Sequence, residues 1–159
     1  MGRGSLMLLW RLSGKQYARA MDGGYGLLFD GRWNRAGHAV TYCATSPALC
    51  VLEKLVHIED PSLMPDLVMV TYEAPDAIGV EAIDLDDLTE DWRHREGATQ
   101  QRGDAWRRSL STPLLRVPSA IVAPRRSPDR NVLINHDHAE ASHIKIVATE
   151  PFTLDPRLF

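Results

Sequence analysis

Apolar residues recur along the chain in short runs that match strands and in one longer stretch that matches a helix. The strand-like runs are rich in Leu, Val, Ile and Tyr and are separated by Gly, Pro, Asn and Asp. Strands are therefore predicted over residues 6–12, 27–33, 38–44, 67–73, 78–83, 114–123 with a break at Pro118, 131–135 and 144–149.

The helical stretch begins at Ser46-Pro47, where a hydroxyl N-cap precedes a proline at the first helical position. It is predicted to run to about Ile58, since Asp60-Pro61 then stops it. Further helices are predicted at 13–21 and 98–110, with a helical turn near Trp92 and a glycine-rich loop at 22–26.

These elements interleave without a regular strand–helix–strand rhythm, so the predicted fold class is α+β. We expect a curved, mostly antiparallel sheet with flanking helices. A chain of 159 residues is enough for one domain, which is placed at residues 6–159. Residues 1–5 have the composition of an expression-vector leader and are set aside.

Composition argues against several function classes. The net charge of −3 disfavours broad non-specific binding of nucleic acid. Cys43 and Cys50 cannot form a disulfide scaffold and lack the partners of a zinc site, so both are expected to be buried or half-buried free thiols. No apolar run approaches the roughly 18 residues of a membrane span. The run at 6–10 is too short for a signal peptide, and a cytoplasmic location is expected.

One carboxylate borders the apolar stripe of the helix predicted from residue 47. At 100° per residue the centre of the stripe falls near Leu52, which places Glu53 at its edge, beside Leu49 and Val56. A carboxylate in that place can line a cleft, and a solvated residue on the flank of the helix explains the same spacing.

Three other side chains have both a structural and a functional interpretation. Arg32, beside Trp33 in a glycine-bounded segment, can present its guanidinium to a phosphate or carboxylate, or can be a surface arginine on a hairpin. Tyr42 lies in an apolar strand, where a core tyrosine is the usual explanation. Ser119 lacks the Gly-x-Ser-x-Gly pattern of a hydrolase nucleophile and can simply make a local hydrogen bond.

Common cofactor and metal motifs do not fit. The glycines at 23, 24 and 26 lack the spacing of a dinucleotide-binding loop and precede a predicted strand. The histidines at 136, 138 and 143 match no standard metal site. The aspartates at 84, 86 and 87 lack the glycine and distal glutamate of a calcium loop, so no metal is expected.

Taken in order, several separated motifs resemble the RES-domain proteins, over nearly the whole chain. The motifs are Trp10-Arg11, Gly31-Arg32-Trp33-Asn34, Val40-Thr41-Tyr42-Cys43-Ala44, Leu52-Glu53 with His57, Leu115-Arg116-Val117-Pro118-Ser119, Asn131-Val132-Leu133-Ile134-Asn135 and Asp155-Pro156-Arg157-Leu158. The Arg, Glu and Ser that name the family correspond to Arg32, Glu53 and Ser119.

The resemblance implies a toxin of a bacterial toxin–antitoxin pair, with a fold similar to diphtheria-type ADP-ribosyltransferases. The implied substrate is NAD+, which is hydrolysed, phosphorolysed or used to ADP-ribosylate a protein; in one branch that protein makes phosphoribosyl pyrophosphate. The implied partner is a helix-turn-helix antitoxin that blocks the NAD+ pocket, and neither nucleic acid nor a membrane is a direct partner. The implied pocket residues are Arg11, Arg32, Tyr42, Glu53, Ser119 and Asn135, with Glu53, Arg32 and Tyr42 catalytic.

These residue types suit the reaction. Arg11 and Arg32 can bind the diphosphate through charge-assisted bonds, and Tyr42 can stack on nicotinamide. Glu53 can stabilise the oxocarbenium-like ribose. Nicotinamide leaves as a neutral molecule, so no second carboxyl is needed as an acid. Ser119 is expected to bind the nicotinamide amide or to orient Glu53.

Other functions stay open at this point. A non-catalytic module that inhibits growth through a partner fits the same composition. A nuclease toxin fits less well, because the net charge is acidic and no basic stripe is present. The sequence fixes neither the acceptor of ADP-ribose nor the oligomeric state.

Overall fold

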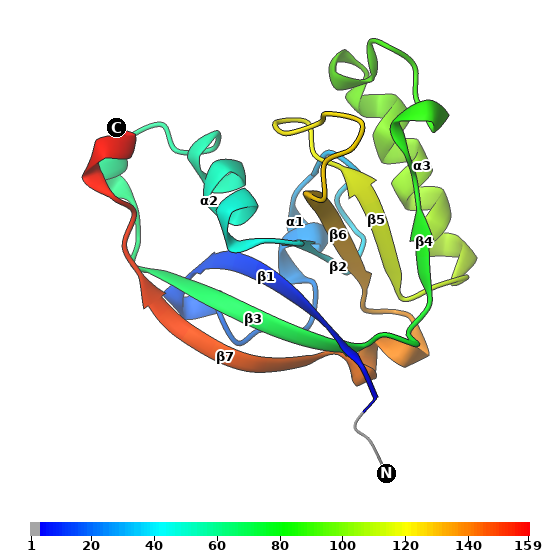
Figure 1. Ribbon diagram of the computed structural model, residues 1–159, viewed down its shortest axis with the longest axis horizontal. Helices are drawn as coiled ribbons and strands as arrows, with labels where there is room; N and C mark the ends of the chain where they lie inside the picture. The colour runs from blue at the N-terminus through cyan, green and yellow to red at the C-terminus, as the bar shows by residue number, and fades with distance from the viewer. Residues whose placement is uncertain (1–3) are drawn as a thin grey trace.

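The computed structural model describes residues 4–159, so residues 1–3 of the segment set aside above lie outside the described part of the chain. Seven strands form one sheet in the order β4-β5-β6-β2-β1-β3-β7 (Figure 1). Neighbouring strands are antiparallel except β4 and β5, which are parallel. The predicted α+β class with a mostly antiparallel sheet is confirmed.

The strands are β1 (Leu6–Gly14), β2 (Val40–Ala44), β3 (Leu67–Pro75), β4 (Val80–Ala82), β5 (Leu114–Pro118), β6 (Arg130–Asn135) and β7 (Lys145–Phe152). The α-helices are α1 (Gly24–Leu28), α2 (Pro47–Leu55) and α3 (Glu96–Ser109). Short 3-10 helices lie at Lys15–Tyr17, Pro61–Leu63, Leu85–Asp87, Trp92–His94, Ala139–His143 and Pro156–Leu158. Within residues 4–159, no helix combines the length and apolar character needed to cross a bilayer.

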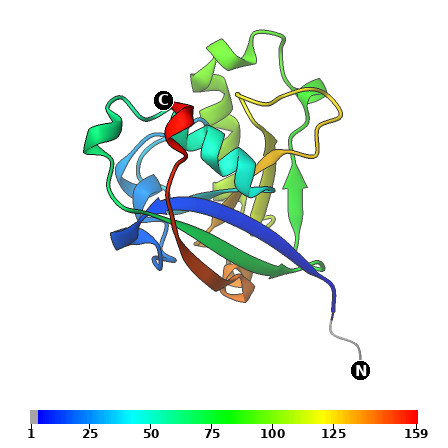
Figure 2. The same ribbon diagram turned by 60° about the vertical axis from the view of Figure 1, so that its left-hand side comes forward.

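The sheet divides into two halves where β1 meets β2. β1 pairs with β3 along its whole length, and β2 does the same with β6. Between β1 and β2, however, only Trp10 and Ala44 are in register. The two halves therefore diverge from this pair, and Figures 1 and 2 show β1, β3 and β7 running crosswise to the strands of the other half.

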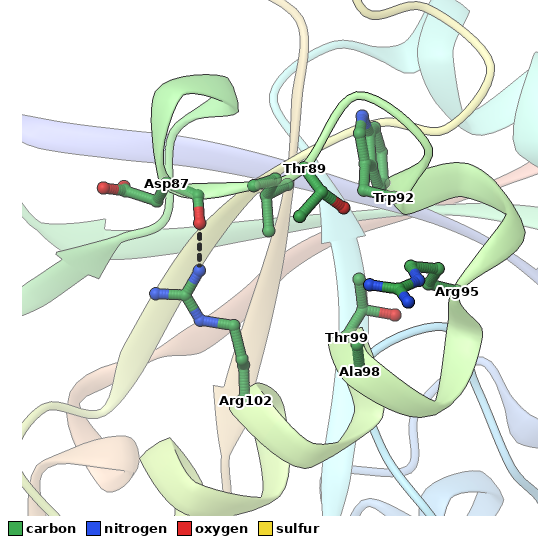
Figure 3. Close-up of a pocket in the computed structure, with 8 residues that line it drawn as sticks. Asp87, Thr89, Trp92, Arg95, Ala98, Thr99 and Arg102 are labelled. Atoms are coloured by element: carbon green, nitrogen blue, oxygen red, sulfur yellow. Dashed lines mark hydrogen bonds between the residues drawn. The ribbon is translucent and has the colours of Figure 1, made fainter.

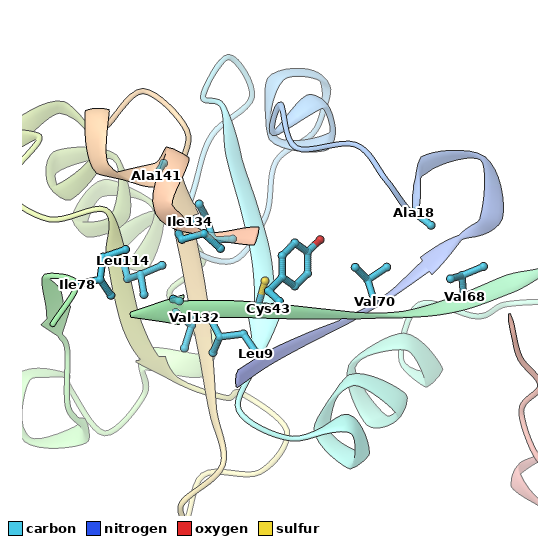
Figure 4. Close-up of a cluster of buried hydrophobic side chains, with 13 residues drawn as sticks. Leu9, Ala18, Cys43, Val68, Val70, Ile78, Leu114, Val132, Ile134 and Ala141 are labelled. Carbon is cyan, nitrogen blue, oxygen red and sulfur yellow. The ribbon is translucent and has the colours of Figure 1, made fainter. Parts of the chain in front are cut away.

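A hydrophobic cluster fills the space between the two halves. Leu9, Val70 and Tyr72 come from one half and Cys43 and Val132 from the other (Figure 4). Successive residues of a strand point to opposite faces. Tyr42 and Ala44, the neighbours of Cys43 along β2, accordingly point to the other face. Tyr42 belongs to a cluster that α3 covers, and Ala44 belongs to a cluster that α2 covers.

α2 begins as the sequence predicts and ends earlier. The Ser46 hydroxyl accepts the N–H of Leu49 at 3.2 Å, and Pro47 is the first helical residue. Leu49 and Cys50 are the buried residues of this helix, whereas Leu52 is 39% exposed. The buried face of α2 is thus not centred near Leu52, as the spacing suggested, but between Leu49 and Cys50.

Three predicted elements differ in the structure. Residues 27–33 are not a strand, because Gly23 adopts a left-handed φ of 67° and turns the chain into α1. The predicted helix over 13–21 is reduced to Lys15–Tyr17, since β1 continues to Gly14 in register with β3. The strand that starts at Leu114 ends at Pro118, where the missing N–H ends the pairing.

α3 holds the segment 31–35 against the sheet. The Thr99 hydroxyl donates to the carbonyl of Arg32 at 2.6 Å, and the Gln100 amide donates to the carbonyl of Gly31 at 2.9 Å. Gly103 lies directly against the backbone carbonyl of Trp33, where any side chain would collide. The position of Arg32 therefore depends on close contact between a helix and a loop backbone.

Gly103→Ala is expected to destabilise the protein, although alanine normally stabilises a helix by about 1 kcal/mol relative to glycine. The added methyl group meets the Trp33 carbonyl, which cannot move aside cheaply, so we expect a loss of about 1–3 kcal/mol in the free energy of unfolding. Gly97→Ala in the same helix has open space around the new methyl group and should be neutral or stabilising. Urea unfolding of the three proteins measures both effects, and equal stability of the two variants would contradict the packing.

Candidate functional site

Glu53 points toward the sheet. It lies four residues after Leu49 and three after Cys50, so its side chain shares the buried face of α2. Its Oε1 atom accepts two hydrogen bonds, one from the Ser119 hydroxyl at 2.8 Å and one from the Asn131 amide at 2.9 Å. The other carboxylate oxygen, Oε2, has no hydrogen-bond donor among residues 4–159. The carboxylate is therefore held by one oxygen and presents the other.

Ser119 is fully buried immediately after β5. Its Oγ atom accepts the N–H groups of Ile121 at 3.0 Å and Val122 at 3.1 Å while it donates its proton to Glu53. The hydroxyl has one proton and two acceptor lone pairs, and all three are used. This geometry favours the expectation that Ser119 orients Glu53.

Asn131 is the site residue that sequence reasoning missed. It stands opposite Ala44 on one side and Val117 on the other, so its side chain lies on the face covered by α2. The chain enters α2 directly after β2 ends at Ala44. Because β6 is antiparallel to β2, the first residues of β6 and not the last lie beneath the helix. That topological signal would have selected Asn131.

Asn135 is not brought to Glu53. It lies four residues after Asn131 in β6, which places it roughly 13 Å from Asn131 at the usual rise per residue. Its side chain is fully buried, donates to the carbonyl of Arg107 at 3.1 Å and accepts the N–H of Asp137 at 3.1 Å. These bonds connect the end of β6 to α3.

Tyr42 lies on the same face as Asn131. It stands opposite Leu133, which makes Tyr42 and Asn131 diagonal neighbours about 7–8 Å apart. Its hydroxyl donates to Asn34 Oδ1 at 2.6 Å and accepts the N–H of Trp33 at 2.9 Å. Burial raises the pKa of Tyr42. The phenol therefore stays neutral, and its hydroxyl is fully occupied.

Arg32 precedes the segment that Tyr42 holds. Its guanidinium donates to the carbonyl of Arg93 at 3.1 Å and lies 5.9 Å from the centre of the Trp92 ring, which Arg93 also approaches at 5.7 Å. The positive charge of Arg32 lowers the pKa of Tyr42, but by less than burial raises it. Arg32 is thus close to Tyr42 and bound to an uncharged acceptor.

Two small cavities lie near these groups. One, of about 140 Å³, is lined by the segment after Leu85–Asp87 and by α3, and it includes Trp92 and Thr99 (Figure 3). The other, of about 210 Å³, lies between Asp86, Arg125 and Arg130. Pockets for complete small-molecule ligands usually measure about 300–1,000 Å³. Each of these cavities therefore fits only a part of a dinucleotide, and neither includes Glu53.

Arg11 projects from the opposite face of β1 to its neighbour Trp10. Its Nε atom donates to the Tyr72 hydroxyl at 2.9 Å, and its guanidinium also donates to the carbonyl of Tyr17 at 3.1 Å. Burial, and to a lesser degree the charge of Arg11, lower the pKa of Lys54 in α2. Arg11 therefore lies on the face of β1 opposite the one that α2 covers, without a hydrogen bond to the other candidate residues.

The two cysteines are free and buried, as predicted. Cys50 donates its thiol hydrogen to the carbonyl of Trp10 at 3.1 Å. Burial raises the pKa of Cys50 to about 12 and also raises the pKa of Cys43. Neither cysteine therefore forms a reactive thiolate near neutral pH. Among the described residues, no group of three or more His, Cys, Asp or Glu is arranged to bind a metal.

Comparison with known proteins identifies similar chains. The RES domain model matches residues 8–155. A protein of Pseudomonas putida named Toxin Res is 39% identical over 155 residues, which are 96% of this chain and all of that protein. A protein of a Sphingobium species named Prs ADP-ribosylating toxin is 32% identical over 94% of each chain. A crystal structure of the M. tuberculosis MbcT-MbcA toxin-antitoxin complex contains a chain with a TM-score of 0.72 and 16% identity, over 94% of this chain and 86% of that one, which shows a common fold.

The environment of His136 predicts a pH-dependent stability. Its ring contacts the Thr41 hydroxyl at 2.7 Å, and burial lowers its pKa below the ordinary value of 6.5, against the opposing charge of Asp22. The unfolded chain therefore binds a proton near pH 6.5 that the folded chain does not, so stability falls as the pH drops below this value. We expect the Tm to fall more between about pH 7 and about pH 5 in the wild type than in His136→Gln. His143→Gln, at an exposed position, is the control and should follow the wild type; parallel curves for all three proteins would contradict the assignment.

Proposed function

The chain belongs to the RES-domain family, and from this we propose that it is a toxin that cleaves the bond between nicotinamide and ribose in NAD+. The observation that carries the proposal is the carboxylate of Glu53, fixed on one oxygen by Ser119 and Asn131 and open on the other. The name of the Sphingobium relative supports the substrate, because ADP-ribosylation uses NAD+ as the donor of the transferred group.

Glu53 can stabilise the charge that develops when this bond breaks. The electron pair of the bond from C1′ to the pyridinium nitrogen goes to the nitrogen, nicotinamide leaves neutral, and the ribose acquires oxocarbenium character. A carboxylate that is already oriented stabilises this cation without reorganising during the reaction. The acceptor then forms a new bond to C1′ and loses a proton. We assign Oε2 of Glu53 to the sugar, since Oε1 is occupied.

Tyr42 and Arg32 are proposed to hold the dinucleotide. The hydroxyl of Tyr42 is occupied by Asn34 and Trp33, so the face of its ring is the part available to stack on nicotinamide. Arg32 can exchange the neutral carbonyl of Arg93 for a phosphate, because a charge-assisted hydrogen bond is the stronger one. Arg11 is proposed as a second binder at the separation of β1 and β2. We keep Asn135 out of the binding assignment and give it a role at the end of β6.

We further propose that the group transferred is ADP-ribose and that a protein accepts it. The name of the Sphingobium relative describes this outcome for a protein called Prs. The chain found in complex with an antitoxin in the similar crystal structure supports an antitoxin partner for this chain. Its helix-turn-helix character and its blocking of the NAD+ pocket are parts of the same proposal.

Glu53→Gln keeps the size of the side chain and removes its charge. The release of nicotinamide from NAD+ should fall by about 10²–10³, as expected for the loss of one preorganised charged group. Toxicity on expression should fall with it. Glu59→Gln, an exposed carboxylate beyond the end of α2, is the matched control and should keep the wild-type rate. Wild-type turnover in Glu53→Gln would exclude the mechanism.

Arg32→Ala should weaken NAD+ binding by about tenfold or more in calorimetric titration, because it removes charge-assisted hydrogen bonds. Arg32→Lys should restore little of the affinity, since the planar fork is lost. Arg93→Ala keeps the backbone carbonyl that Arg32 uses and also removes a guanidinium from Trp92, so it is the matched control. If Arg32→Ala and Arg93→Ala bind NAD+ as tightly as the wild type, Arg32 does not bind the diphosphate.

The acceptor can be identified separately. Incubation of a bacterial lysate with NAD+ and the protein should add the mass of ADP-ribose to one cellular protein. Loss of NAD+ without any modified protein would select hydrolysis or phosphorolysis. No release of nicotinamide under either condition would favour a non-catalytic interaction module.

A further inference from the structure

We propose that Asn131 is a positioning residue for Glu53, whose amide fixes which carboxylate oxygen faces the substrate. The inference rests on the proposed function, because it assigns Asn131 a role in the same site. Asn131 donates its Nδ2 hydrogen to Oε1 of Glu53 at 2.9 Å and, among the described residues, its side chain makes no other hydrogen bond. It is therefore committed to the carboxylate alone.

The fold alone gives no reason for an asparagine at this place. Asparagine is disfavoured in strands, and β6 lies between β5 and β2 with pairs on both sides. The next three residues of β6, Val132, Leu133 and Ile134, are buried and apolar. The cross-strand neighbours of Asn131 are Ala44 and Val117, beside which a β-branched residue would pack better. A polar residue that breaks the local rule indicates a role in the site.

Asn131 is also the donor whose backbone belongs to the sheet. It is held by pairing on both sides within the sheet, whereas Ser119 lies just beyond the end of β5 and shares its oxygen with two N–H groups of the following turn. Both donors converge on Oε1. Together they prevent the carboxylate from rotating, and the donor on β6 sets the direction in which Oε2 points.

The nearby charged groups do not take over this task. The Arg130 guanidinium donates to the backbone carbonyls of Ser127 and Asp129, and the carboxylate of Asp129 accepts the hydroxyl of Ser46 at 3.0 Å. On the helix side, Cys50 donates to the carbonyl of Trp10.

Among the described residues, neither Lys54 nor Arg11 donates a hydrogen bond to Glu53. Lys54 follows Glu53 in α2, and Arg11 donates to Tyr72 and to the carbonyl of Tyr17. In the described chain, only Ser119 and Asn131 donate hydrogen bonds to Glu53.

Removal of the amide should lower kcat at every pH. In Asn131→Ala and in Asn131→Val, which suits a strand, we expect kcat for nicotinamide release to fall by about 10–100-fold, with KM for NAD+ within about threefold of the wild type. The two variants differ in stability but should agree in kcat. If the Ala variant does not fold, the Val variant carries the test. Wild-type kcat in either folded variant would overturn the role of Asn131.

Asn131→Asp gives a readout that a purely structural role would not produce. The new carboxyl can donate to Glu53 only while the pair of carboxyl groups retains one shared proton. We therefore expect kcat of Asn131→Asp to lie near that of the wild type at about pH 5.5 and to fall by a further tenfold or so by about pH 8.5. The loss in Asn131→Ala should be the same at both pH values. A profile for Asn131→Asp that runs parallel to that of Asn131→Ala would overturn the proposal.

Gln101→Asp is the control for charge. It adds a carboxyl at an exposed position in α3, a helix that contributes neither Glu53 nor its two donors, so its pH profile should follow that of the wild type. The experiment also separates the two proposals. A wild type that releases no nicotinamide overturns both, whereas an active wild type, an inactive Glu53→Gln and an unaffected Asn131→Val overturn only the role of Asn131.

Discussion

The single register pair between Trp10 and Ala44 is the constraint on which the rest of the molecule depends. Because β1 and β2 meet only there, the two halves of the sheet diverge and enclose a hydrophobic cluster. α2 packs at this junction, where Cys50 donates its thiol hydrogen to the carbonyl of Trp10. One turn further along the same face of the helix, Glu53 is carried over the first residues of β6. The place of the carboxylate thus follows from how the sheet divides.

A chain of buried polar contacts performs the same task on the other side of the site. Tyr42 anchors the turn at 31–34 through Asn34 and the N–H of Trp33. Thr99 of α3 donates a hydrogen bond to the same turn. A buried polar group is costly when it is unpaired, so each of these bonds specifies one arrangement. Arg32 projects from this fixed turn, which gives a flexible side chain a rigid base.

The sequence predicted most of the strands and the start of α2, because alternation and capping are local signals. Two predictions were wrong because they depend on the path and packing of the folded chain. The left-handed conformation of Gly23 directs the chain into α1 where a strand was predicted, and α2 buries the face of Leu49 and Cys50. The hydrogen bond from Ser119 to Glu53 matches one of the two roles that the sequence left open for Ser119. Asn131 was missed in favour of Asn135, since both fit the same motif and only the pairing of β6 with β2 distinguishes them.

The order of the strands leaves β4 and β7 at the two margins of an open sheet. Unpaired strand margins invite other chains to add to them, and proteins guard them with short strands, charges and proline. β4 has three residues, and β7 carries Lys145, Glu150 and Pro151. These features disfavour the pairing of either margin with the backbone of a second chain.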